Sequence, residues 1–293
     1  EIVRIEPKGS FQRIEFTGNE NVPAGKIKRY MQTKEGGIAP WLTGSGSFRR
    51  DYLDADTQII RSVFLEEGYV DVEVVPPKVY LSPDKRFIFV SFQIDEGALY
   101  EIGSIDVDGD FVDEEGLTRE AVLEIVDGTT VVDVQEDQWR EATGRRDPIL
   151  DFPSRGPRIR AGDTFKLSTL QLVMSAITDL YSDQGYAQAN VIPQTFTDPE
   201  TKKVDITFVV DKGEKYRIGR INITGNDPTF DKVVRRELVI DEGDVYRGSR
   251  IKASRARLQR LGYFDEISIS TPRGDGDNVM DMNIQVSEQP TGS

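Results

Sequence analysis

The stretch LQRLGYFDEISIS, at residues 258–270, places a Gly-Tyr pair between a helical pattern and an alternating pattern. Nearly the same arrangement occurs twice earlier, as FLEEGYVDVEV from Phe64 and LYSDQGYAQANV from Leu180. A glycine directly after a helix commonly takes the left-handed conformation that ends it. A following tyrosine can pack its ring across the turn into the next strand. We therefore interpret the three pairs as structural corners, the Gly-Tyr corners, because no second feature assigns chemistry to their tyrosines.

The same elements surround each corner. Upstream lies a short strand pattern that ends in glycine: RIEFTGN (13–19), SIDVDGD (104–110) and RINITGN (220–226). Two helical patterns follow, and two further strands come after the corner, the second of which alternates apolar and polar residues. The polar alternate positions indicate a sheet with one face on helices and one in water. The sequence therefore predicts an α+β fold of three tandem β-α-α-β-β domains, each with a three-stranded mixed sheet packed on two helices.

The helices are clearest in the last unit. The first is expected at 229–238, with Phe230 and Val234 on its apolar face. The second is expected at 249–261, with the small Ser254 on the same face as the apolar residues.

The spacing of the corners sets the domain boundaries. The predicted domains are residues 10–98, 99–214 and 215–290. The middle domain carries a long insert at about 129–162, rich in glycine and proline. The joints between domains share one pattern, in EGALYEIGSI (96–105) and KGEKYRIGRI (212–221). Such short joints leave little room for a flexible linker, so limited hinging is expected.

Composition excludes several classes of function. The 293 residues include no His and no Cys, which removes Ser-His-Asp and Cys-His catalysis and the commonest transition-metal ligand. A net charge of −14 disfavours binding to nucleic acid or to anionic lipid by the whole surface. DVDGDFVDEEGL (106–117) resembles the start of a calcium loop but has Phe111 where glycine is required and Leu117 where glutamate is required. We predict no catalytic residue, no metal site and no cofactor, with a carboxylate-based enzyme such as a glycosidase as the alternative.

No apolar run approaches the roughly 18 residues that a membrane-spanning helix needs. The first residue is Glu1 and no signal peptide opens the sequence, as expected of a mature or excised fragment.

The repeated unit resembles the POTRA domain. The last unit, GNDPTFDKVVRRELVIDEGDVYRGSRIKASRARLQRLGYFDEISI followed by VSEQPTGS, is similar to the membrane-proximal POTRA domain of the BamA family of outer-membrane-protein assembly factors. The first unit resembles the same family through PWLTGSGSFRRDYLDADTQIIRSVFLEEGYVDVEV, whereas the middle unit departs from it through its insert. The related TamA family, which also carries three such domains, stays open as an alternative.

This resemblance implies a location and a set of partners. The three units would be the last three POTRA domains before a β-barrel, in the periplasm, as part of an outer-membrane protein. They would serve the folding and insertion of outer-membrane proteins. The implied partners are unfolded outer-membrane protein clients and lipoprotein subunits of the assembly complex.

Prolines at or near the end of the strand after each corner predict that this strand lies at a sheet edge. An open edge can add an extended peptide as a further strand. The candidate client edge comprises Asp71, Val72, Glu73, Val74, Val75, Val191, Ile267 and Ile269. The first unit is preferred, since Phe87 and Phe89 should face outward beside it. The alternative is that these edges are tolerated surface, with proline as protection against aggregation.

A basic run marks the second helix of the last unit. Its cations, with no acidic residue between them, are Arg247, Arg250, Lys252, Arg255, Arg257 and Arg260. They form either a solvated helix face or a contact for an acidic partner or the headgroups of the outer membrane's inner leaflet.

Overall fold

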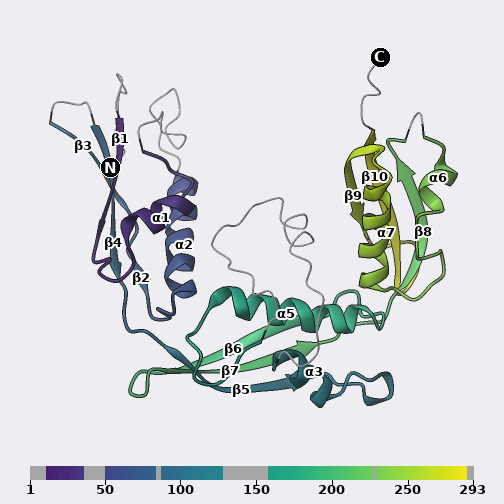
Figure 1. Cartoon of the computed structure of the whole chain (residues 1–293), viewed down its shortest axis with the longest axis horizontal. Helices are drawn as coiled ribbons and strands as arrows, with labels where there is room; N and C mark the ends of the chain where they lie inside the picture. Colours follow the sequence, from purple (N-terminus) through teal and green to yellow (C-terminus); the bar gives the residue numbers. More distant parts are fainter. Residues whose placement is uncertain (1–10, 36–49, 84–86, 128–157, 227–228, 289–293) are drawn as a thin grey trace. The chain divides into compact units, whose positions relative to one another are not determined.

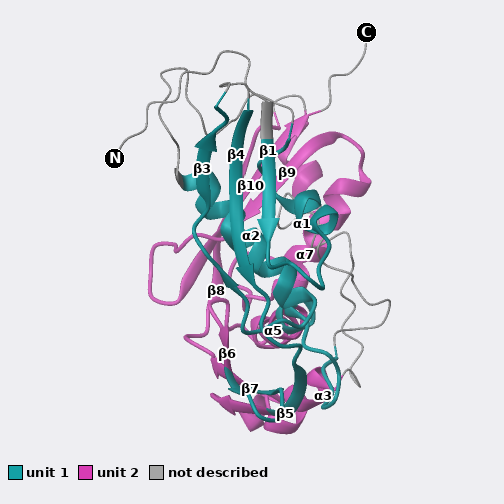
Figure 2. Ribbon diagram, turned by 90° about the vertical axis from the view of Figure 1, so that its left-hand side faces the viewer, with its two compact units in different colours: residues 1–105, 133–171, 195–206 teal, residues 106–132, 172–194, 207–293 magenta. Residues whose placement is uncertain are grey.

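The computed structural model describes residues 11–35, 50–83, 87–127, 158–226 and 229–288 (Figure 1). The chain divides into two compact units (Figure 2). Unit 1 comprises Glu1–Ile105, Asp133–Gln171 and Thr195–Ile206. Unit 2 comprises Asp106–Val132, Leu172–Gln194 and Thr207–Ser293. Within the described residues, no helix is long and apolar enough to cross a membrane.

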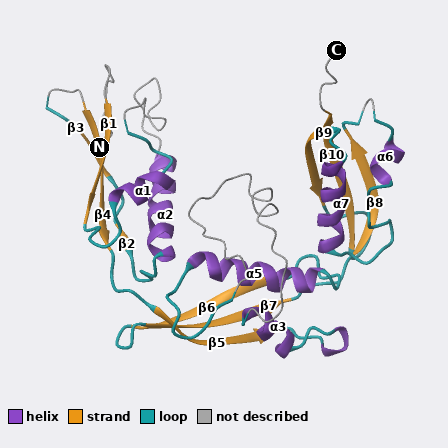
Figure 3. Ribbon diagram, viewed as in Figure 1, coloured by secondary structure: helices purple, strands orange, loops and turns teal. Residues whose placement is uncertain are grey.

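The first repeat, in unit 1, is a mixed sheet backed by two helices (Figure 3). Its elements are β1 (Phe11–Thr17), α1 (Ala24–Tyr30), α2 (Arg50–Glu66), β2 (Glu73–Val74), β3 (Lys78–Leu81) and β4 (Phe87–Asp95). The strand order is β1-β4-β2, with β3 also on β4. Strand β4 is parallel to β1, and β2 and β3 are antiparallel to it. The structure thus has four strands here and not the three predicted, because Pro76 and Pro77 interrupt the strand after the corner.

Alternation along β4 and helical spacing along α2 build the core of the first repeat. The buried side chains from these two elements are Leu53, Ile60, Val63, Phe64, Ile88, Val90, Phe92 and Ile94. Fully burying one such side chain contributes roughly 1.5–3 kcal/mol, so this shared core holds the helix on the sheet.

The third repeat, in unit 2, has the same design. Its elements are β8 (Arg217–Thr224), α6 (Asp231–Arg235), α7 (Gly248–Arg260), β9 (Phe264–Ser270) and β10 (Val279–Glu288). The strand order is β8-β10-β9, with β10 parallel to β8 and antiparallel to β9. The predicted second helix is confirmed as α7. Ser254 lies fully buried on the inner face of this helix, where its hydroxyl accepts from the Val239 amide at 3.0 Å.

The predicted first helix of this repeat is too long, and its Phe230 is misplaced. Helix α6 begins only at Asp231, and Phe230 precedes it in an extended conformation. The Phe230 side chain is therefore 74 % exposed and does not join the core.

The middle repeat contains the remaining elements. They are β5 (Glu101–Gly109), the short 3-10 helix η1 (Asp113–Glu115), α3 (Arg119–Val126), α5 (Leu167–Ser182), β6 (Asn190–Asp198) and β7 (Lys203–Asp211), with strand order β5-β7-β6. Of the predicted insert at 129–162, only 158–162 is described, without helix or strand; the rest lies outside the described residues. The predicted α+β fold of three repeated units with mixed sheets is confirmed.

Candidate interaction surfaces

The Gly-Tyr corners have the predicted backbone, and their tyrosines differ in how far they are buried. Gly68, Gly185 and Gly262 have φ of +95°, +104° and +66°, in the left-handed region. Tyr186 is buried, and the ring of Tyr69 lies edge-on to Phe64 with centroids 6.0 Å apart. Tyr263 lies edge-on to Phe264, the first residue of β9, with ring centroids 6.4 Å apart, but it is 51 % exposed and covers its corner less fully.

What covers each corner explains this difference. At the first, the amide of Tyr100 donates to the carbonyl of Gly68 at 2.9 Å, and a Cβ on Gly68 would lie 2.8 Å from Leu99 Cδ1. At the second, the amide of Tyr216 donates to the carbonyl of Gly185 at 2.8 Å. Around Gly262, no described atom lies within 4 Å of such a Cβ. The segments that join one repeat to the next therefore pack against the first two corners.

The joint tyrosines Tyr100 and Tyr216 are buried, and the hydroxyl of each bonds to the residue three positions after the corner glycine. Tyr100 donates to the carboxylate of Asp71, and this bond raises the pKa of Tyr100 to about 12. Tyr216 donates to Gln188 Oε1 at 2.9 Å. Asp71, predicted to be part of a client edge, thus has its carboxylate in the joint. The joint pattern was visible in the sequence, but this role of its tyrosine was missed.

A carboxylate two residues before the corner glycine caps the second helix of the next repeat. Glu66 accepts from the amide of Ser168 at 2.8 Å and from its hydroxyl at 2.6 Å, at the start of α5. Asp183 accepts from the amide of Ser249 at 2.8 Å, at the start of α7. Both acids satisfy amides that a helix N-terminus leaves unpaired. Burial raises the pKa of Glu66 above its ordinary value. The third repeat has Arg260 at this position.

The strands after the corners lie at sheet edges, as predicted: β2, β6 and β9 each end the order of their sheet. The side chains of Val72, Val191 and Ile267 are nevertheless buried, so only their backbones could meet an added strand. Val75 is 42 % exposed. The remaining predicted edge residues divide into the exposed Glu73 and the half-buried Val74 and Ile269.

An aromatic cluster covers the outer sheet face of the first repeat. The rings of Tyr80 and Phe89 stack with centroids 5.0 Å apart, and Phe87 lies 6.3 Å from Phe89. Arg13 Cζ lies 4.7 Å from the centroid of Phe87, and Tyr80 donates to Glu15 Oε2 at 2.6 Å. Phe87 and Phe89 alternate with buried Ile88 and Val90, so the prediction that they face outward is confirmed.

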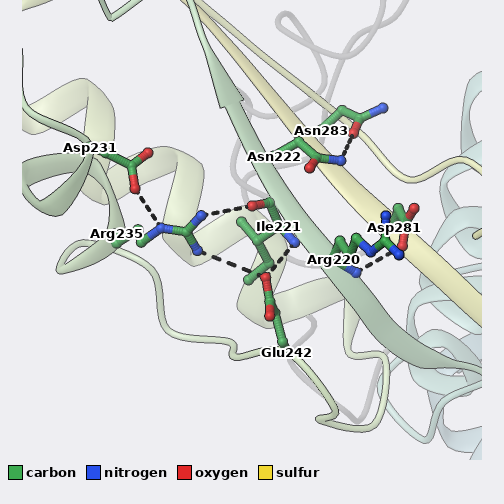
Figure 4. Close-up of polar contacts among 8 residues, drawn as sticks. All are labelled: Arg220, Ile221, Asn222, Asp231, Arg235, Glu242, Asp281 and Asn283. Atoms are coloured by element: carbon green, nitrogen blue, oxygen red, sulfur yellow. Dashed lines mark hydrogen bonds and ion pairs between the residues drawn. The ribbon is translucent and has the colours of Figure 1, made fainter.

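The third repeat has polar groups on the corresponding face (Figure 4). Asp281 Oδ1 accepts from the amide of Arg220 at 2.8 Å, and Asn222 Nδ2 donates to Asn283 Oδ1 at 2.9 Å. A Cβ on Gly219 would lie 2.3 Å from Asp281 Oδ1, so the glycine makes room for this carboxylate.

The middle repeat repeats this contact with Asp205 in place of Asp281. Asp205 Oδ1 accepts from the amide of Ser104 at 2.5 Å and from its hydroxyl at 2.7 Å. These bonds lower the pKa of Asp205. Sequence reasoning missed both acids, although the Ile-Gly-x-Ile joints and the Val-Asp-Ile and Met-Asp-Met strands carry a signal for them.

Arg235 of α6 ties this helix to the middle of β8 (Figure 4). Its Nη2 donates to the carbonyl of Ile221 at 2.9 Å, and its Nε donates to Asp231 at 2.7 Å. Glu242 accepts from the amide of Ile221 at 2.9 Å and lies 3.9 Å from Arg235.

Half of the basic run on α7 has structural partners. Lys252 pairs with Asp179 at 2.7 Å and Arg250 with Asp244 at 3.3 Å. Arg255 donates to the carbonyl of Ile267 on β9 at 2.7 Å.

The remaining three cations are exposed. Arg260 bonds only to a carbonyl of its own helix, that of Ala256, at 3.3 Å. The side chains of Arg247 and Arg257 have no polar partner within the described part of the chain. A contact with headgroups or an acidic partner is therefore open to Arg247, Arg257 and Arg260. The described residues contain no group of three acidic side chains placed to hold a metal ion.

Three α+β repeats, each with one strand after its glycine corner at a sheet edge, define a tandem-repeat protein. A family model described as "POTRA: Surface antigen variable number repeat" matches residues 10–97, 100–213 and 216–289. The chain belongs to the POTRA family. The exact domain boundaries predicted from the sequence remain a prediction.

Similar proteins support the predicted subclass. The chain is 29 % identical to the outer membrane protein assembly factor BamA of Nitratidesulfovibrio vulgaris, over 96 % of this chain and 32 % of that protein. It is 27 % identical to BamA of Neisseria meningitidis, over 96 % of this chain and 31 % of that protein. The chain thus spans about a third of these relatives. A crystal structure of Haemophilus influenzae BamA POTRA3-5 superimposes with a TM-score of 0.70 at 21 % identity, covering 96 % of each chain, and supports the fold. The resemblance to the POTRA region of BamA-type assembly factors is confirmed.

Proposed function

We propose that this chain is a periplasmic, non-enzymatic scaffold of outer-membrane protein assembly that takes up extended client segments as added strands. The observation that carries this proposal is the edge position of the strand after each corner. Backbone pairing suits clients of variable sequence, because it does not read side chains. The relatives that share this architecture are named outer membrane protein assembly factors.

The edge of β2 in the first repeat is the preferred client site. The amide of Val75 donates to the carbonyl of Gln93 on β4 at 2.9 Å, so the amide of the neighbouring Val74 faces away from β4. That amide and the exposed Val75 side chain offer a client a donor and an apolar contact. The Tyr80–Phe89 stack on the same sheet extends the apolar surface.

The energetics favour weak and reversible capture. Each added hydrogen bond contributes roughly 0.5–1.5 kcal/mol, whereas ordering each client residue costs roughly 1–2 kcal/mol. The net free energy of backbone pairing alone is therefore close to zero, and apolar contacts decide whether a client stays bound. A scaffold that passes clients onward needs this weak binding.

The third repeat would supply the second type of contact. Its cations without a partner on another element, Arg247, Arg257 and Arg260, suit an acidic surface of a lipoprotein subunit or the headgroups of the inner leaflet. Neither partner requires the cations already bonded to Asp179, Asp244 and Ile267.

The client site is tested by nuclear magnetic resonance on the whole chain. The probe is a lysine-flanked peptide of alternating valine and threonine with a paramagnetic label. We expect broadening of the amides of Glu73, Val74 and Val75. Val74→Pro removes the outward amide without removing a ladder bond, and should abolish this broadening.

The matched control is a probe peptide of the same composition with central prolines, which cannot pair as a strand. Unchanged signals at 73–75 in the wild-type chain, or equal broadening in Val74→Pro, would overturn the preferred site.

A further inference from the structure

A single arginine occupies the free edge of the third sheet. The guanidinium of Arg255, on α7, donates to the carbonyl of Ile267 from Nη2 at 2.7 Å and from Nε at 3.3 Å. Arg255 is half-buried, and Ile267 lies at the centre of β9. Strand β9 has β10 on one side only.

This contact lies where an added strand would have to pair. Every second residue of an edge strand turns its carbonyl and amide away from the sheet, and an incoming strand bonds to these groups. The guanidinium of Arg255 already bonds to the carbonyl of Ile267, at the centre of β9, through two N–H donors. Its planar, charged head also fills the space that an incoming backbone amide needs.

The other two repeats provide an internal comparison. Seven residues before the corner glycine, α7 has Arg255, α2 has Arg61 and α5 has Thr178. Arg61 is exposed and its side chain has no polar partner in the described ranges. Thr178 donates to the carbonyl of Met174 in its own helix at 2.9 Å. Of the three, Arg255 alone bonds to the edge strand of its repeat.

We propose that Arg255 is a latch that closes the β9 edge to strand addition, so that extended polypeptide segments attach to the edges of the other repeats, β2 above all. This inference rests on the proposed function. It gives Arg255 a role in selecting which sheet edge takes up a client strand.

The test compares Arg255→Met with Arg61→Met, using the labelled valine-threonine peptide. Methionine retains an unbranched stem that can pack on the helix but removes the donors. In the wild-type chain and in Arg61→Met, broadening should appear at the β2 edge and be absent from the β9 edge. In Arg255→Met, new broadening should appear at Ile267 and Ile269, with at least fivefold greater peptide occupancy at β9.

Two results would overturn the latch: equal broadening at β9 in the wild-type chain, or none at β9 in Arg255→Met while β2 still responds. Absence of broadening at every edge in every protein would remove strand addition itself, and the latch with it.

A measurement on the unmutated chain covers the case in which the variant does not fold. The Nε–H of Arg255 should exchange with solvent at least tenfold more slowly than that of Arg61. Equal exchange rates would show that the latch is absent in solution.

Discussion

The first and third repeats share one frame, by which we mean their strand order and the buried core between sheet and helices. They differ at their surfaces. Their strand orders, β1-β4-β2 and β8-β10-β9, correspond, and the central strands β4 and β10 alternate buried side chains in the same way. Outward, the first repeat presents stacked aromatic rings, whereas the third presents Asn222, Asn283 and Asp281. Arg255 bonds to the edge strand β9 of the third repeat. Two residues before the corner glycine, the third repeat has Arg260 where the first repeat has Glu66.

This comparison separates two kinds of constraint. Inward positions must fill a core between sheet and helices, so they stay alike in all repeats. Outward positions and corner residues meet solvent, the next repeat or a partner, and these change between repeats.

The largest effect is expected from the glycine that ends the first strand of each repeat. Gly18 and Gly225 have φ of +87° and +82°, and a Cβ on either would lie 2.0 Å from a carbonyl oxygen, that of Ile94 or Val286. Replacement by alanine combines a strained backbone with a clash against rigid main chain, at a cost of about 3 kcal/mol. Hydrogen exchange of the core amides measures the free energy of unfolding of each repeat. We expect Gly18→Ala to destabilise the first repeat and Gly225→Ala the third by similar amounts.

The control is Gly25→Ala, in α1. No described atom lies within 4 Å of a Cβ there, and alanine favours a helix over glycine by roughly 0.5–1 kcal/mol. A slight stabilisation should result. If Gly18→Ala and Gly225→Ala differ by more than 2 kcal/mol, as an order-of-magnitude bound, the frame is not shared as described.

The next effect concerns the corners, where the repeats differ. Glu66→Ala removes both bonds to Ser168 and leaves its buried hydroxyl without this partner, at a cost of about 2 kcal/mol. Arg260→Ala, at the equivalent place, should change stability by less than about 0.5 kcal/mol. Hydrogen exchange at the start of α5 measures the first change, and exchange in β10 measures the second. An equal loss in both variants would contradict the capping role of Glu66.

The same carboxyl carries a pH dependence. Burial raises the pKa of Glu66 from its ordinary 4.5, against the lowering effect of the Ser168 bonds and of Lys166. The folded state therefore holds this proton more tightly than the unfolded state, and stability falls as pH rises from about 4.5 through the folded pKa. Glu66→Gln lacks this loss, so its stability relative to the wild type should rise across that window and stay level above it. A flat difference would show that the pKa is not raised.

The frame was predictable from sequence because its signals are local. A left-handed glycine after a helix and alternation along a strand each depend on neighbouring residues. Ser254 was placed correctly because helical spacing determines which side of a helix a residue occupies. Phe230 was misplaced because spacing does not determine where a helix begins, and α6 starts one residue after it.

The contacts that distinguish the surfaces were not predictable in this way. Glu66 and Ser168 are 102 residues apart, and nothing beside either residue indicates the other. Tyr263 follows the same Gly-Tyr pattern as Tyr69, but what covers a corner comes from a different repeat. Arg61 and Arg255 occupy equivalent helix positions, and only the structure shows that one of them reaches an edge strand.

The smallest effect, and the one that tests the outward difference most directly, concerns charge. Arg257 is exposed on α7 without a polar partner in the described chain, as is Arg61 on α2. A cation near an anionic surface contributes about 1 kcal/mol to binding, so Arg257→Ala should weaken binding to phosphatidylglycerol vesicles by about fivefold. Stability should change by less than about 0.5 kcal/mol. Vesicle co-sedimentation of the whole chain at low salt measures the loss.

Arg61→Ala is the matched control, since it removes the same charge from an exposed position on α2 of the first repeat. If the third repeat faces a headgroup layer, Arg61→Ala leaves vesicle binding unchanged. Equal weakening in the two variants would mean that the vesicles respond to net charge alone. The basic run of α7 would then be a solvated helix face, and the first and third repeats would differ only at the corner and the edge.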